Sequence, residues 1–103
     1  MESIPIYARN LLFLRVLKKN SQKEIADLIG KGTAMSIAKV EKGNGRLIID
    51  DLITLADHFA VTETELLRHQ FWRMSDEEIL KLKRRWKEKE DTEKQAEHVL
   101  QTA

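Results

Sequence analysis

The sequence predicts an all-α protein in which five short helices precede one long helix. Proline occurs once and glycine four times among 103 residues, so few positions interrupt a helix. Three segments begin with Ser or Thr followed three residues later by Glu, the capping box that starts a helix. Apolar residues recur at helical spacing after these starts. Together these observations favour helices over strands.

The composition indicates one small domain with an appendage in a reducing compartment. The chain has no cysteine, which excludes a disulfide framework and a thiolate metal site and is typical of a cytoplasmic protein. The most apolar stretch, residues 11–17, is far shorter than the roughly 20 residues that span a bilayer. No signal peptide or membrane anchor is recognisable. We therefore expect a cytoplasmic protein with no membrane association.

The first helix is expected over residues 7–18 and is apolar on two sides. Its core-facing side carries Tyr7, Leu11, Phe13, Leu14 and Leu17. A second stripe, formed by Ala8, Leu12 and Val16, would remain in water in an isolated domain. Either a partner covers this stripe, or its members are surface hydrophobes without consequence.

Two short helices come next, over residues 22–29 and 34–42. Ser21 and Glu24 form the capping box before the first helix, and Thr33 caps the second. Each helix is too short to bury its own apolar side alone, so the pair must be packed together.

Glycines punctuate this helix pair. Gly30 and Gly32 supply the backbone freedom for a sharp turn between the two helices. After the second helix, the loop of residues 42–46 contains Asn44-Gly45, a pair suited to positive φ.

The remaining helices are expected over residues 50–59, from the Thr62–Glu65 capping box to about residue 69, and over residues 76–100. The first of them is expected to bury Leu52, Ile53, Leu55, Ala56 and Phe59. The last carries an apolar stripe of Ile79, Leu82 and Trp86 and follows a boundary near residues 70–75.

Charge is distributed unevenly along the chain. Residues 1–49 hold nine Lys or Arg against four Asp or Glu, whereas residues 50–103 hold nine against thirteen. The basic half contains the two short helices. A local positive field of this kind is a modest indication of a nucleic-acid partner.

A run of positions in register extends over more than half the chain. Its members are Asn10, Leu11, Leu14, Arg15, Gln22, Ile25, Ala26, Ile37, Val40, Glu41, Gly43, Leu55, Ala56, Val61, Thr62, Glu65, Leu66 and Leu67. This pattern resembles the Cro and phage-repressor type of helix-turn-helix domain, also called the XRE-like family. The resemblance implies a five-helix, lambda-repressor-like DNA-binding domain over residues 1–70. Residues 71–103 would then be an additional long C-terminal helix for dimerisation or partner binding.

The resemblance also implies roles for individual residues. The groove-facing set that contacts bases would be Thr33, Ala34, Met35, Ser36 and Lys39. Contacts to DNA phosphates would come from Gln22, Lys31, Lys42, Asn44 and Arg46. In similar proteins an acid ending the recognition helix and an arginine on the first helix brace each other, which assigns Glu41 and Arg15 a structural role.

Three departures from the family pattern stand out. The spacing from Gln22 to Glu41 is one residue longer than usual, and we place the extra residue in the turn, where it would tilt the recognition helix. Asn20 replaces the usual apolar residue before the second helix, and Ile48 stands where a capping Ser or Thr is normal. We interpret both replacements as mild local defects.

Other chemistries find little support. The segment "GKGT" lacks the glycine spacing and the preceding strand of a phosphate-binding loop. His58, His69 and His98 are scattered, so we expect no metal, no cofactor and no enzymatic activity. The run "KLKRRWK" at residues 81–87 is either an extra DNA-contacting arm or the solvated side of one helix, and the second interpretation is favoured.

The sequence thus predicts a homodimeric, sequence-specific transcriptional regulator that binds double-stranded DNA and acts as a repressor. Its dimer or partner surface would comprise Leu12, Val16, Phe71, Trp72, Ile79, Leu82 and Trp86. The alternative is a protein-interaction adaptor, or an antitoxin whose C-terminal helix binds a partner protein such as a toxin.

Overall fold

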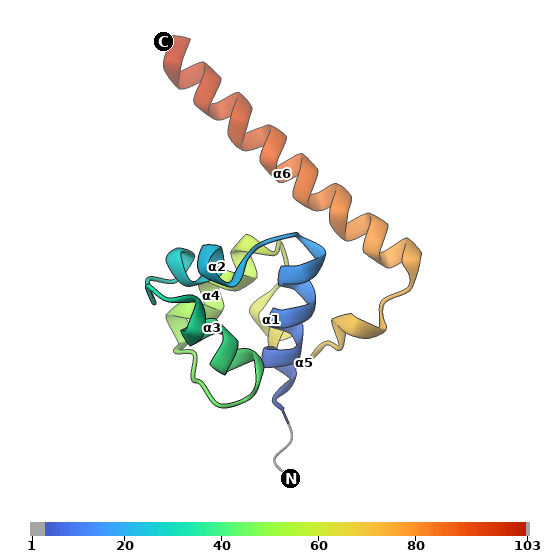
Figure 1. The fold of residues 1–103 in the computed structure, drawn as a ribbon. Coiled ribbons are helices and arrows are strands. Elements are labelled where there is room, and N and C mark those ends of the chain that lie inside the picture. Colours follow the sequence, from blue (N-terminus) through green and yellow to red (C-terminus); the bar gives the residue numbers. More distant parts are fainter. Residues whose placement is uncertain (1–3, 103) are drawn as a thin grey trace. The chain divides into compact units, whose positions relative to one another are not determined.

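The computed structural model describes the backbone of residues 4–102 and the side chains of residues 4–96, and its regular structure there is entirely helical (Figure 1). Contacts divide the chain into two units, Met1–Arg73 and Met74–Ala103. No helix in the described part of the chain is long and apolar enough to cross a membrane.

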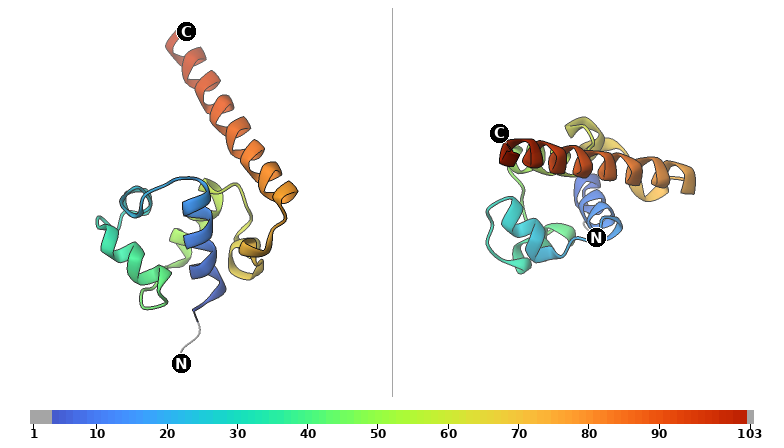
Figure 2. Two further views of the ribbon diagram at one scale, coloured as in Figure 1. Left: turned by 45° about the vertical axis from the view of Figure 1, so that its right-hand side comes forward. Right: turned by 90° about the horizontal axis from the view of Figure 1, so that it is seen from above.

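The first unit contains α1 (Ile6–Leu17), α2 (Gln22–Leu28), α3 (Ala34–Glu41), α4 (Ile49–His58), α5 (Glu63–Arg68) and the short 3-10 helix η1 (Phe71–Arg73). The second unit is the single helix α6 (Asp76–Thr102). The prediction of an all-helical chain is confirmed, and η1 is the one element in the described residues that the sequence did not indicate. In both views of Figure 2, α2 and α3 lie side by side.

The expected capping boxes form. The Ser21 hydroxyl accepts the Glu24 amide at 3.0 Å, and the Glu24 carboxylate accepts the Ser21 amide at 2.9 Å. These bonds from Ser21, its backbone amide first, lower the pKa of the exposed Glu24 carboxyl. Thr62 and Glu65 repeat the arrangement at the start of α5. Local sequence therefore fixes where these helices begin.

Helix α4 begins without a capping hydroxyl. Ile48 offers no side-chain acceptor, as expected, and the Asp51 carboxylate accepts the Ile48 amide at 3.2 Å. Asp51 thereby satisfies one orphan donor and places a negative charge near the positive end of the helix.

The core of the first unit is built from one face of each helix. Its fully buried apolar side chains include Leu11, Leu14, Ile25, Ala26, Ile37, Val40, Leu55, Ala56, Phe59 and Leu66. Two expectations were wrong. Ala8 is 0% exposed rather than part of an outer stripe, because it lies two turns before Arg15 on the side of α1 that meets α3. Ile53 is 47% exposed, since it lies about 100° around α4 from Leu52, at the flank of the buried face.

The loop after α3 depends on glycine in a different way from that expected. Positive φ occurs at Gly43 (84°), not at Asn44-Gly45, so that prediction was wrong. At Gly45 a Cβ would lie 2.8 Å from the Val40 amide nitrogen, and close approach is what requires glycine there. In the earlier turn, Gly30 and Gly32 do adopt positive φ, at 71° and 76°.

Asn20 is not a defect. Its side-chain oxygen lies 2.8 Å from Nε2 of His58, and its carbonyl accepts a bond from Arg15 at 3.1 Å. Lys18 in turn donates to the His58 carbonyl at 2.7 Å. The segment after α1 is therefore tied to the end of α4 by polar contacts where related patterns use an apolar one.

Asn10 joins α1 to the chain after α5. Its side-chain amide is 0% exposed and donates to the carbonyls of Leu66 and His69 at 2.8 and 2.7 Å. Its oxygen accepts the Phe71 amide at 3.2 Å. One side chain thus satisfies three backbone groups that α5 and η1 leave without helical partners.

We predict that Asn10→Ala lowers the free energy of unfolding by about 3 kcal/mol, because it leaves buried polar backbone groups without partners. Urea denaturation followed by circular dichroism measures the change. The control is Asn44→Ala, at an exposed position, for which we expect a change within about 0.5 kcal/mol. Equal losses for the two proteins would contradict the role given to Asn10.

Candidate nucleic-acid interface

Helix α3 is held by apolar contacts on its inner side. Ile37 and Val40 of α3 are 0% and 2% exposed, and Ile25 and Ala26 of α2 are 1% and 0% exposed. A side chain larger than Ala26 would push the two helices apart. The inner sides of α2 and α3 are therefore packed against each other, and the opposite side of α3 faces outward.

The outward side of α3 carries the residues that the sequence singled out. Thr33, Met35 and Lys39 are exposed, Met35 by 67%, whereas Ala34 and Ser36 are half-buried. The Thr33 hydroxyl accepts the Ser36 amide at 3.3 Å and lies 2.9 Å from the Ser36 hydroxyl. Thr33 therefore starts the helix and still presents its side chain to solvent.

Cations flank this outward side. Lys42, Asn44 and Arg46 are exposed in the loop after α3, whose path is held by the amides of Asn44 and Gly45 donating to the Lys39 carbonyl at 2.8 and 3.1 Å. The loop thus places two exposed cations directly after α3.

Two of the expected phosphate ligands already have partners. The Lys31 ammonium lies 3.6 Å from Asp51, and the Gln22 side-chain amide donates to the Glu41 carboxylate at 2.8 Å. Each retains further donor capacity, since an ammonium has three donors and a side-chain amide has two. Their positions nevertheless depend on contacts within the protein.

A buried carboxylate connects the first three helices. Glu41, 6% exposed at the end of α3, accepts two bonds from the Arg15 guanidinium of α1 at 3.0 and 3.2 Å and one from Gln22 of α2. This bidentate geometry fixes orientation as well as distance. The expected structural role of Arg15 and Glu41 is confirmed, and Gln22 joins them in a way that sequence reasoning did not indicate.

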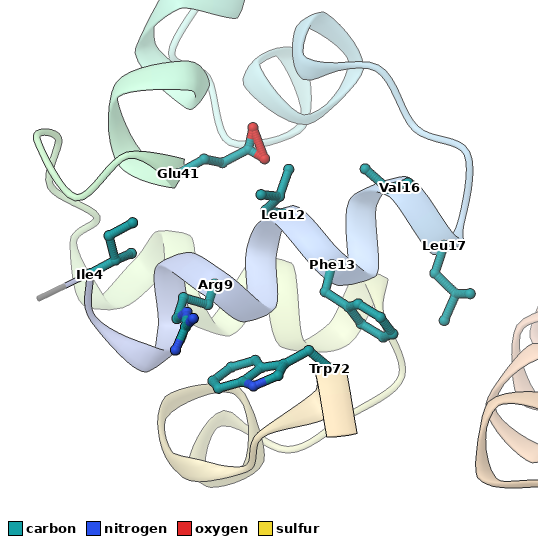
Figure 3. A pocket seen from close by; sticks show the side chains of 8 residues that line it. All are labelled: Ile4, Arg9, Leu12, Phe13, Val16, Leu17, Glu41 and Trp72. Atoms are coloured by element: carbon teal, nitrogen blue, oxygen red, sulfur yellow. The ribbon is translucent and has the colours of Figure 1, made fainter. Parts of the chain in front are cut away.

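A second surface feature is a mainly apolar groove over α1 (Figure 3). It has a volume of about 690 Å³ and is lined by Ile4, Arg9, Leu12, Phe13, Val16, Leu17, Glu41 and Trp72. Leu12 and Val16 are 43% and 58% exposed, and the Arg9 guanidinium lies 4.7 Å from the centre of the Trp72 ring. The expectation that Leu12 and Val16 lie outside the core is confirmed.

Phe71 is not available to a partner. It is 3% exposed, its amide is bound by Asn10, and its ring contacts that of His69 edge to face at 4.6 Å between centroids. The prediction of Phe71 as a partner residue was wrong, because η1 returns it onto α1. Trp72 lines the groove. Of the predicted partner residues on α6, Ile79 is half-buried, and Leu82 and Trp86 are 3% and 8% exposed. Their role at a partner surface stays a prediction.

No group of three or more His, Cys, Asp or Glu in the described residues is arranged to hold a metal ion. His58 contacts Asn20, His69 contacts Phe71, and the side chain of His98 lies outside the described residues.

Comparison with protein-family models, curated proteins and solved structures gave no significant match.

We predict that Glu41→Ala lowers the free energy of unfolding by about 2–3 kcal/mol, because the half-buried Arg15 guanidinium and the Gln22 amide lose their shared acceptor. The matched control is Asp27→Ala, which breaks the Lys23–Asp27 ion pair, with side chains 58% and 59% exposed, and should change stability by about 0–1 kcal/mol. Thermal or urea denaturation of both proteins gives the comparison. A loss at Glu41 no larger than that at Asp27 would refute its bracing role.

Proposed function

We propose that this chain is a sequence-specific, double-stranded-DNA-binding transcriptional regulator, a cytoplasmic repressor of the XRE-like, lambda-repressor-like class. In this proposal α2 and α3 form a helix-turn-helix, and α3 enters the major groove. The observation that carries it is the exposed outward side of α3, on a helix whose other side is fixed by buried contacts and which is followed by a loop with two exposed cations.

The dimensions of α3 suit this role. An α-helix with its side chains is about 10–12 Å across, and the major groove is about 12 Å wide. The capped end, rather than the end near Glu41, faces outward with Thr33 and Met35. Amino-terminal residues of a recognition helix are those that reach base edges.

Each outward side chain has a defined chemistry toward DNA. Lys39 donates to guanine O6 or N7, and the Ser36 hydroxyl donates or accepts at several base edges. Met35 and Ala34 contribute apolar contact, for instance to a thymine methyl group. Because two of the base readers are apolar, specificity would rely in part on DNA shape.

Affinity would come mainly from phosphates. Lys42, Asn44 and Arg46 lie exposed beside α3, and cations there release counterions from the DNA backbone on binding. Gln22 and Lys31 complete the set, each still holding a donor beyond its internal bond.

The groove over α1 supports a homodimer. Leu12 and Val16 are exposed there beside Trp72, and apolar surface of this kind is characteristic of association sites. A twofold dimer would present two α3 helices to half-sites about one DNA turn apart.

The same groove favours a second candidate function, a protein-interaction adaptor or an antitoxin that binds a partner protein such as a toxin. Met35, 67% exposed on α3, is also compatible with a protein partner. An adaptor would use these apolar surfaces and would not need the cations of the loop after α3.

We predict that Lys39→Ala reduces discrimination between an operator and a random duplex by about 1–3 kcal/mol, because it removes a base contact. Arg46→Ala should instead weaken binding to both duplexes and reduce the salt slope by about 1, since it removes a phosphate contact. Mobility-shift titrations on DNA flanking the protein's own gene test both, with the ion-paired Lys94→Ala as control. An adaptor would bind neither duplex and would keep its partner in both variants.

We also predict that Leu12→Glu combined with Val16→Glu converts a dimer into a monomer, because two charges in the groove prevent its burial. Sedimentation equilibrium measures the mass. Ile53→Glu, at a position 47% exposed on α4, is the control and should leave the dimer intact. A wild-type protein that sediments as a monomer at concentrations that bind DNA would end the dimer proposal.

A further inference from the structure

Helix α6 carries three exposed cations close together on one side. Lys83, Arg84 and Lys87 are exposed, and none of them forms an ion pair with any described residue. At about 100° per residue the three side chains fall within roughly 100° of arc on one side of the helix. We refer to Lys83, Arg84 and Lys87 as the basic face.

The basic face departs from the charge pattern of the rest of α6. Lys81 and Lys94 each follow a glutamate by four residues and pair with it, at 4.0 Å to Glu77 and 3.3 Å to Glu90. This spacing stabilises a helix.

The residues four positions before the basic face include no acid. They are Ile79, Leu80 and Lys83. Lys83 and Lys87 are themselves four residues apart, a like-charge spacing that destabilises an isolated helix. Acids do stand at helical spacing after the basic face, Glu88 four residues beyond Arg84 and Asp91 four residues beyond Lys87, yet no ion pair forms there among the described residues.

A polyanion removes this repulsion. A phosphodiester chain offers successive negative charges to cations aligned along one side of a helix. Arginine adds planar donors that match phosphate oxygens. Leu80 lies on the same side of the helix and is 55% exposed, so it does not cover the cations.

We propose that the basic face is a second DNA-binding surface, which contacts the phosphate backbone of duplex DNA without reading its sequence. The choice of duplex DNA as the polyanion rests on the proposed function of α3. The basic face would supply affinity and salt dependence equally on operator and random DNA, whereas α3 would supply discrimination.

The test compares two double variants that remove the same charge from the same helix. Lys83→Gln/Lys87→Gln neutralises the basic face, and Lys81→Gln/Lys94→Gln neutralises two cations that are already ion-paired. Glutamine keeps a good helix propensity. Fluorescence anisotropy with a random duplex of about 20–30 bp, at about 50 to 200 mM salt, gives the slope of log K against log salt.

We expect the first variant to lose about 1.8 from the steepness of the slope, about 0.9 for each phosphate contact, and the second to lose much less. Thermal unfolding should not follow the loss of binding. The midpoint should change little for Lys83→Gln/Lys87→Gln, which loses both the repulsion between the two lysines and the attraction of Lys87 to Asp91, and fall slightly for Lys81→Gln/Lys94→Gln, which loses two attractions. Weaker binding without weaker folding separates a binding role from a structural one.

Equal slopes for the two variants, or a wild-type slope in the first, would overturn the proposal. The proposal would also be overturned if Lys83→Gln/Lys87→Gln lost binding only to vesicles containing phosphatidylserine, because the basic face would then bind a membrane surface. Lys39→Ala/Arg46→Ala separates the two proposals. If only Lys39→Ala/Arg46→Ala loses DNA binding, the proposal for the basic face is wrong. If Lys39→Ala/Arg46→Ala binds operator and random DNA like wild type while Lys83→Gln/Lys87→Gln loses binding to both, the proposal for α3 is wrong.

Discussion

The carboxylate of Glu41 is the constraint on which the arrangement of the first three helices depends. It is nearly excluded from solvent, and a buried charge is tolerated only when its partners are in place. Those partners come from two other helices, Arg15 of α1 and Gln22 of α2. Any large rotation of α3 would break these bonds and leave the charge unsatisfied. The outward direction of Thr33 and Met35 thus depends in part on bonds made at the opposite end of the helix.

Asn10 plays the corresponding part on another side of α1. Glu41 ties α1 to α2 and α3, whereas Asn10 ties α1 to the end of α5 and to η1. Polar groups with one solution for their hydrogen bonds specify a geometry that apolar packing alone would leave less defined. Glu41 and Asn10 contact two sides of α1, and the side with Leu12 and Val16 is left. The groove therefore lies over the part of α1 that these contacts do not cover (Figure 3).

Much of the fold could be predicted from local chemistry, because capping boxes at Ser21 and Thr62 and the left-handed glycines act within a few residues. Periodicity gave the direction of each apolar face but not its width, which depends on neighbouring elements: Ala8 is 0% exposed, whereas Ile53 is 47% exposed. The role of Asn10 could not be predicted, since its partners Leu66 and Phe71 lie 56 and 61 residues away. The burial of Phe71 depends on the 3-10 helix η1, which the sequence did not indicate. The choice of the outward set on α3 came from the resemblance and from helical spacing together.

The turn between α2 and α3 is held at both ends by contacts within the protein. Gly30 and Gly32 both take positive φ, and the Lys31 amide donates back to Ala26 at 2.9 Å. Lys23 reaches forward to the Gly32 carbonyl at 2.8 Å, while Lys31 pairs with Asp51 of α4. The turn is therefore fixed to α2 on one side and to α4 on the other, and Thr33 caps α3. If α3 binds DNA as we propose, Lys31 would reach a phosphate only with the donors left over from its contact with Asp51, and Lys42 and Arg46 would supply the larger part of the cationic contact.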